Sequence, residues 1–184
     1  MATVSIQTRI CAPAALLWDM VGRFNTLGQW HPLVRRSDTR GVGKGAMRRV
    51  GLISGGTLVE RLEHVSNAER VYLYSVVEGP FPVAHCVSEI RVTDMGDGAS
   101  VVSWTSNFIA LGVPDREAAK ALHAVFKAGL ENIKRIYESL SPGDAKSDIL
   151  GITPGGDLYL YRGNGIGGFT GPGTTIVTGW DLHL

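Results

Sequence analysis

One carboxylate in the sequence is predicted to lie on an apolar strand face, where it could do chemistry. In the segment TLVERLE, Leu58, Glu60 and Leu62 share one face of an extended strand, because side chains alternate with a period of two. A buried carboxylate without a partner is costly. Glu60 therefore either orients a ligand or transfers a proton, or it forms a salt bridge with a neighbouring arginine such as Arg48 or Arg49, and we favour the salt bridge.

His31 is the second candidate for proton transfer, within the run Trp30-His31-Pro32. Its unperturbed pKa is near neutrality, which suits a general acid or base. A lone histidine is more often a hydrogen-bonded structural residue, so catalysis is the minor alternative. The five histidines show no ligand-like spacing, and the two cysteines, Cys11 and Cys86, lie far apart. No metal site is expected.

The sequence carries no motif for a familiar catalytic or nucleotide-binding site. HExxH, CxxC and P-loop patterns are absent, and the glycine-rich run GNGIGG is not followed by a helical pattern. No cofactor is therefore expected. The net charge of +1 gives no electrostatic argument for nucleic acid or membrane binding. No signal peptide or membrane span is evident, so we expect a cytoplasmic protein.

Aromatic side chains share faces in two further strand candidates. These same-face sets are Tyr72, Tyr74, Val76 and Glu78 in one strand, and Val102, Trp104, Ser106 and Phe108 in another. Tyrosine combines an apolar ring with a polar tip and suits the wall of a mixed pocket, although ordinary cross-strand packing is the favoured alternative. Trp104 and Phe108 are predicted to lie in the interior, as core or as pocket lining.

The elements that must position these residues follow a simple order. The patterns predict a strand over 3–10, a helix over 13–22, a short helix with loops over 23–34, strands over 45–53, 56–65, 70–79, 84–94 and 99–111, and a long helix over 114–142. The long helix places Phe126 among apolar residues at three- and four-residue spacings. A run of strands capped by a helix predicts an α+β fold, with a curved antiparallel sheet gripping the last helix.

This arrangement resembles the SRPBCC or START-like superfamily, which includes polyketide cyclase/dehydrase-like proteins. The resemblance covers about residues 2–140 and rests on three runs: APAALLWDMVGRFNTLGQWHPLV, GGTLVERLEHVSNAERVYLYSVVEGPFPV and SVVSWTSNFIALG. It implies a helix-grip fold around an apolar cavity for small hydrophobic molecules. It also places Trp30 and His31 at the cavity mouth, and Phe81 in a Pro-containing loop that gates it. The candidate ligand-binding residues are Trp30, His31, Glu60, Tyr72, Tyr74, Phe81, Trp104, Phe108 and Phe126.

Glycine content divides the chain into two predicted domains, 1–142 and 143–184. The second segment holds 11 of the 24 glycines and lacks glutamate. It contains four strand-like runs, DILGIT, DLYLYRG, TTIVTG and WDLHL, separated by glycine-rich turns. It resembles a single blade of FG-GAP/VCBS-type or tachylectin-like β-propellers. The calcium-binding DxDGD of many such repeats is replaced by TPGGD, so no calcium is expected.

One blade alone would leave apolar side chains in water on both faces of its sheet. The residues concerned are Leu158, Leu160, Ile176 and Trp180. Stacked repeats normally bury such faces, and at least three are needed. We therefore expect either a piece of a longer propeller protein or, as the working hypothesis, a homo-oligomer whose tails build one propeller. Packing of the tail on its own first domain is a third, less favoured option.

Three functions remain open from the sequence. The first is binding of a small hydrophobic ligand in the helix-grip cavity, with several such domains brought together by a propeller formed from the tails. The second is a polyketide cyclase- or dehydratase-like enzyme, with Glu60, His31 or a tyrosine moving protons. The third is lectin-like sugar binding by the assembled propeller. The absence of an evident acid–base pair favours binding, and a mostly filled cavity would weaken the first two.

Overall fold

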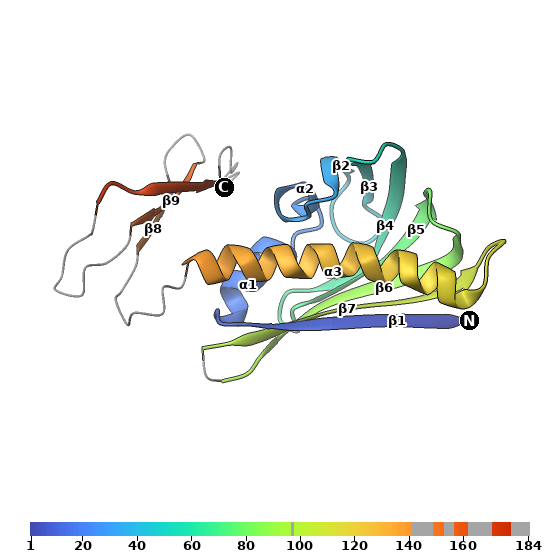
Figure 1. Cartoon of the computed structure of the whole chain (residues 1–184), viewed down its shortest axis with the longest axis horizontal. Coiled ribbons are helices and arrows are strands. Elements are labelled where there is room, and N and C mark those ends of the chain that lie inside the picture. The colour runs from blue at the N-terminus through green and yellow to red at the C-terminus, as the bar shows by residue number, and fades with distance from the viewer. Residues whose placement is uncertain (97, 141–148, 153–156, 162–170, 178–184) are drawn as a thin grey trace. The chain divides into compact units, whose positions relative to one another are not determined.

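A seven-stranded antiparallel sheet forms the first of two structural units. The structure is a computed structural model and describes residues 1–96, 98–140, 149–152, 157–161 and 171–177 (Figure 1). The strand order is β1-β7-β6-β5-β4-β3-β2. The strands are β1 (Ala2–Ile10), β2 (Val34–Arg40), β3 (Met47–Leu52), β4 (Thr57–Ser66), β5 (Val71–Glu78), β6 (Val83–Asp94) and β7 (Ser100–Ala110).

A long helix, α3 (Asp115–Leu140), crosses the concave face of this sheet (Figure 1). Its buried side chains Leu122, Phe126, Leu130 and Ile133 recur at three- and four-residue intervals, which gives the helix one apolar stripe. Two short helices, α1 (Ala14–Val21) and α2 (Leu27–Trp30), connect β1 to β2. The chain therefore has the predicted α+β helix-grip architecture. No helix in the described residues is both long and apolar enough to cross a membrane.

The period-two patterns in the sequence correspond to the buried face of the sheet. Leu58, Glu60 and Leu62 are all buried on β4, and their sequence neighbours Val59 and Arg61 are less buried. Gly55 and Gly56, both with φ near +90°, form the turn between β3 and β4. This turn fixes the pairing of the two strands, so that Arg48 of β3 faces Glu60 of β4.

The edge strand β2 was not predicted. Its sequence, VRRSDTR, carries charges at four of seven positions, and Val34 is its only buried residue. An edge strand that pairs on one side does not need the alternating apolar pattern of a buried strand. The opposite edge is β1, which pairs with β7 over its whole length.

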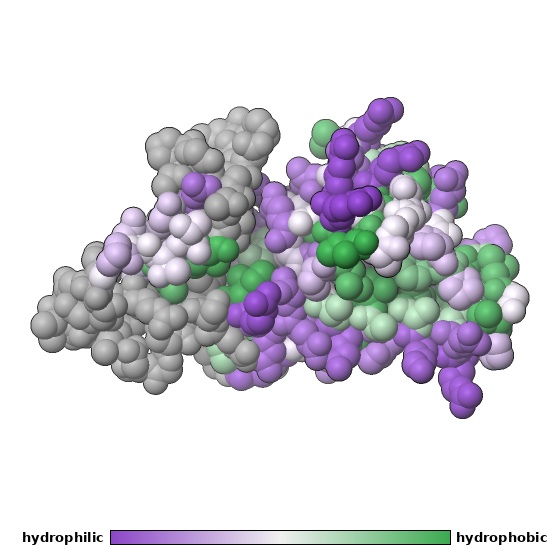
Figure 2. All heavy atoms as spheres, turned by 45° about the horizontal axis from the view of Figure 1, so that its top comes forward, coloured by the Kyte–Doolittle hydropathy of each residue, from purple (hydrophilic) through white to green (hydrophobic). Residues whose placement is uncertain are grey.

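The surface of the first unit mixes apolar and hydrophilic areas. Figure 2 shows one face on which a green, apolar area is bordered by purple, hydrophilic side chains. Ile53, in the turn after β3, and Leu111, in the turn after β7, are both more than half exposed. Single exposed apolar residues are normal in soluble domains.

A separate three-stranded antiparallel sheet follows α3, in the order β10-β9-β8. The strands are β8 (Ile149–Ile152), β9 (Leu158–Tyr161) and β10 (Thr174–Val177), which correspond to the first three strand-like runs of the tail. The fourth predicted run and Trp180 lie outside the described residues. Of the predicted oligomerisation residues, Leu160 is buried and Ile176 is half-buried. Leu158 begins β9.

Candidate functional site

A small, mainly apolar pocket lies between the concave sheet face and α3. Its volume is about 40 Å³, which is room for a few waters, whereas ligand pockets for drug-sized molecules measure several hundred Å³. The interior is thus mostly filled by side chains. The lining residues are Leu27, His31, Val34, Val50, Leu52, Leu58, Glu60, Tyr74, Val76, Phe81, Cys86, Ser88, Trp104, Leu122, Val125 and Phe126.

The structure brings six of the predicted ligand-binding residues together and separates three from them. His31, Glu60, Tyr74, Phe81, Trp104 and Phe126 line the pocket. Trp30 is buried but does not line the pocket, and its ring centroid lies 5.8 Å from that of Trp104. Tyr72 packs instead against Trp18 and Phe24. Phe108 is fully buried but does not line the pocket.

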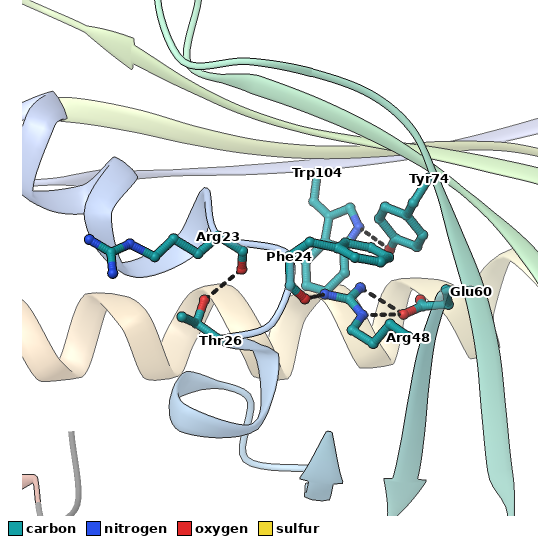
Figure 3. Close-up of polar contacts among 7 residues, drawn as sticks. All are labelled: Arg23, Phe24, Thr26, Arg48, Glu60, Tyr74 and Trp104. Atoms are coloured by element: carbon teal, nitrogen blue, oxygen red, sulfur yellow. Dashed lines mark hydrogen bonds and ion pairs between the residues drawn. The ribbon is translucent and has the colours of Figure 1, made fainter. Parts of the chain in front are cut away.

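Glu60 forms a buried ion pair with Arg48 at one end of the pocket (Figure 3). Nε of Arg48 donates to Oε2 of Glu60 at 2.7 Å, and Nη2 lies 2.6 Å from the same oxygen as an ion-pair contact without hydrogen-bond geometry. Nη1 donates to the carbonyl oxygen of Phe24 at 2.7 Å, and the Phe24 ring covers the guanidinium 4.0 Å from its centroid. Burial raises the pKa of Glu60, and Arg48 opposes that rise. Of the two arginines considered from the sequence, Arg48 is the ion-pair partner of Glu60, whereas Arg49 is exposed.

His31 is buried and held in one neutral tautomer. The backbone N–H of Leu33 donates to Nδ1 at 3.2 Å, so Nδ1 carries no proton. Nε2 lies 3.1 Å from the carbonyl oxygen of Val125, which can only accept, so Nε2 carries the proton and donates. Burial lowers the pKa of His31 to about 4. These contacts tie the turn before β2 to α3.

His31 and α3 approach so closely because position 129 is glycine. A Cβ added at Gly129 would lie 2.8 Å from Cδ2 of His31 and 3.0 Å from Cζ3 of Trp104. Trp104 also stacks on Phe126, with ring centroids 4.4 Å apart and planes at 10°. Its indole N–H donates to the hydroxyl of Tyr74 at 2.9 Å. Trp104 is therefore held in place by stacking on Phe126 and by its hydrogen bond to Tyr74.

A polar strip on β6 and β7 includes Ser106, which the sequence placed on the face of Trp104, together with Cys86 and Ser88, which sequence reasoning did not assign to the pocket. Sγ of Cys86 lies 3.1 Å from Oγ of Ser106, and the Ser88 hydroxyl donates to the same oxygen at 3.0 Å. The register of β6 and β7 shifts between Ala84 and Val87. His85 in this bulge has φ of +49°. The bulge turns Cys86 inward, so period-two counting from the start of the strand fails there.

The two candidate proton carriers do not form a pair. Glu60 bonds to Arg48, and both ring nitrogens of His31 bond to backbone. The described residues hold no hydrogen bond between them and no group of three or more His, Cys, Asp or Glu side chains that could hold a metal. The arrangement can present hydrogen-bonding groups to a ligand, but it lacks a linked acid and base.

Residues 1–138 match the family described as polyketide cyclase / dehydrase and lipid transport, and the chain belongs to this family. This class joins ligand-binding and cyclase-type proteins on one fold. Among relatives, an abscisic acid receptor of Arabidopsis thaliana is 25% identical over 148 residues, which cover 76% of this chain and 70% of the receptor.

Solved structures show the same fold. The protein XoxI from Bacillus cereus is 30% identical with a TM-score of 0.73, and the match covers 76% of this chain and 98% of that chain. The Zhui aromatase/cyclase from Streptomyces sp. R1128 has a TM-score of 0.63 over 78% of this chain and 98% of its own. At 20% identity it shows the fold alone.

Proposed function

We propose that the first unit binds a small hydrophobic ligand in the pocket between the sheet and α3. The observation that carries this proposal is the composition of the lining. Apolar and aromatic side chains surround a few polar groups, Glu60, Tyr74, Cys86 and Ser88, which could orient a ligand. The relative that is named a receptor for abscisic acid supports the same class of function.

The pocket must widen to admit such a ligand, and Phe81 is the residue proposed to move. Phe81 lines the pocket from the β5–β6 loop and is half-buried. The β3–β4 loop passes near this loop, because a Cβ added at Gly56 would lie 3.9 Å from Cγ of Pro80. The backbone N–H of Leu111 bonds to the carbonyl oxygen of Pro82. Three loops thus meet at the proposed entrance.

A matched pair of substitutions tests ligand binding. Val76 lines the pocket, and the next residue, Val77, is half exposed. We expect Val76→Phe to abolish binding of an uncharged apolar fluorescent dye such as N-phenyl-1-naphthylamine, because the added ring fills the remaining volume. Val77→Phe should leave dye binding unchanged. Equal dye binding by both variants would refute the proposal, and circular dichroism checks that both are folded.

Catalysis is the second candidate, because the family includes cyclase-type proteins. No observation on the site favours it over binding, since His31 and Glu60 are each engaged by other partners. Lectin-like binding by the tail depends on assembly of the blades and has no support beyond the sequence resemblance.

We propose, as a separate point, that residues 143–184 are a propeller blade that assembles copies of the chain. The support is a three-stranded antiparallel sheet with the strands expected from the sequence. Light scattering on the full chain and on residues 1–142 tests this. We expect a ring of several subunits for the full chain and a monomer for the truncation. A monomeric full chain would refute it.

A further inference from the structure

The two oxygens of Glu60 have different surroundings. Oε2 accepts the hydrogen bond from Nε of Arg48 and makes the ion-pair contact with Nη2. Oε1 receives no hydrogen bond from any of the described residues, although Glu60 is 98% buried and lines the pocket. A carboxylate oxygen is a strong acceptor with two lone-pair directions. Oε1 of Glu60 can therefore accept a hydrogen bond from a ligand in the pocket.

The positive partner is not available to a ligand. All three guanidinium nitrogens of Arg48 lie within 2.7 Å of a protein oxygen, and the Phe24 ring covers one face. Arg48 is absent from the pocket lining. His31, the ring in the lining that could become a cation, is neutral with both nitrogens engaged. A ligand entering the pocket thus meets a carboxylate and no accessible cation.

We propose that the pocket selects neutral apolar molecules that carry a hydroxyl, such as an alcohol or a phenol, and discriminates against carboxylates. A ligand hydroxyl donates to Oε1 of Glu60, and a bond to a charged acceptor is among the stronger hydrogen bonds. A ligand carboxylate would lie beside the exposed oxygen of Glu60 and would bring into a site of low dielectric a charge that no accessible cation compensates.

An ammonium ligand is disfavoured for a different reason. Arg48 already neutralises Glu60, so an incoming cation would be the one uncompensated charge in the pocket. The Tyr74 hydroxyl oxygen is a neutral acceptor that already accepts the indole N–H of Trp104, so Oε1 of Glu60 is the stronger acceptor for a ligand. This inference rests on the proposed ligand-binding function and narrows it to one class of ligand.

Three matched single-ring probes test the selection on the full chain at pH 7.5. They are p-cresol, p-toluate and p-xylene, which differ only in the group that would face Glu60. Binding is followed by NMR through the indole N–H signal of Trp104. We expect p-cresol to bind about tenfold more tightly than p-xylene, from the extra hydrogen bond. We expect p-toluate to bind more weakly than p-xylene.

Variants assign the preference to Glu60. Glu60→Gln alone leaves Arg48 buried without its partner, so the double variant Arg48→Met/Glu60→Leu replaces both charges by apolar groups. In this variant p-cresol should lose its tenfold advantage over p-xylene. Glu63→Gln is the control, because Glu63 lies on the same strand and pairs with Arg61 and Ser75 outside the pocket. It should keep the wild-type order.

The outcomes separate this inference from the function on which it rests. Binding of p-xylene together with equal or tighter binding of p-toluate would overturn the selection and leave the hydrophobic pocket standing. An unchanged cresol preference in the double variant would also overturn it. Binding of none of the three probes would overturn the proposed function, and the inference with it.

Discussion

Two buried polar groups in the same interior are stabilised in opposite ways. Glu60 is matched by the guanidinium of Arg48, which forms an ion pair with it, donates one hydrogen bond to its Oε2 and donates a second to the Phe24 carbonyl oxygen. His31 gives up its charge, and burial lowers its pKa to about 4. The first solution makes each partner indispensable to the other, whereas the second makes the structure sensitive to pH. The predictions below probe that difference.

The largest effect is expected from breaking the ion pair on one side. Glu60→Gln removes the counter-charge of a fully buried guanidinium, which typically lowers the free energy of unfolding by about 3–5 kcal/mol. Urea denaturation measures this. The double variant Arg48→Met/Glu60→Leu should recover most of the loss, because an apolar pair needs no counter-charge. If Glu60→Gln is as stable as wild type, buried Arg48 does not depend on Glu60 for its stabilisation.

His31 should make stability fall in mildly acidic solution. The folded pKa, about 4, lies below the unfolded value of 6.5, so between these values only the unfolded chain takes up the proton. The free energy of unfolding should fall by up to about 3 kcal/mol as the pH drops from 6.5 to 4. Urea titrations across this range measure it. In His31→Gln this part of the pH dependence should vanish, and its persistence would contradict the assignment.

Gly129→Ala tests how tightly His31 is held. The new Cβ would press on His31 and Trp104 at 2.8 and 3.0 Å. Overpacking of this kind typically costs about 1–3 kcal/mol, which exceeds the gain of up to about 1 kcal/mol in helix propensity. Thermal unfolding measures the balance. If Gly129→Ala is more stable than wild type, the side chains of His31 and Trp104 can move aside at little cost, and His31 is not tightly held.

The smallest effect is expected outside the pocket. Glu63 pairs with Arg61 and accepts a hydrogen bond from Ser75. The Ser75 and Arg61 hydrogen bonds lower the pKa of Glu63. Exposed pairs typically contribute about 0–1 kcal/mol, so Glu63→Gln should cost less than 1 kcal/mol in the same urea assay. If Glu63→Gln lowers the free energy of unfolding as much as Glu60→Gln does, burial does not determine how much an ion pair contributes in this sheet.

Local patterns in the sequence predicted the fold class and all strands of the large sheet except β2, but they did not predict the partners in the site. The burial of Leu58, Glu60 and Leu62 follows from alternation along one strand. The choice between Arg48 and Arg49 depends on strand register, which the turn at Gly55 and Gly56 sets. Only the folded chain shows it, because a shift of one residue exchanges the two faces.

Contacts distant in sequence account for what was missed. His31 bonds to Val125, 94 residues away, so its neutral state could not be inferred from its neighbours. Cys86 reaches the pocket because of a bulge that has no clear sequence signal. The edge strand β2 lacks an apolar pattern altogether.

The small size of the pocket bears on the kinetics of any ligand. With about 40 Å³ free, a guest larger than a few waters needs the pocket to widen, and under the proposal made above it waits for the loops near Phe81 to part. The observed dissociation constant is then the intrinsic one divided by the fraction of molecules that are open. Association would be slow for the same reason, and a bound molecule would leave only as often as the entrance reopens.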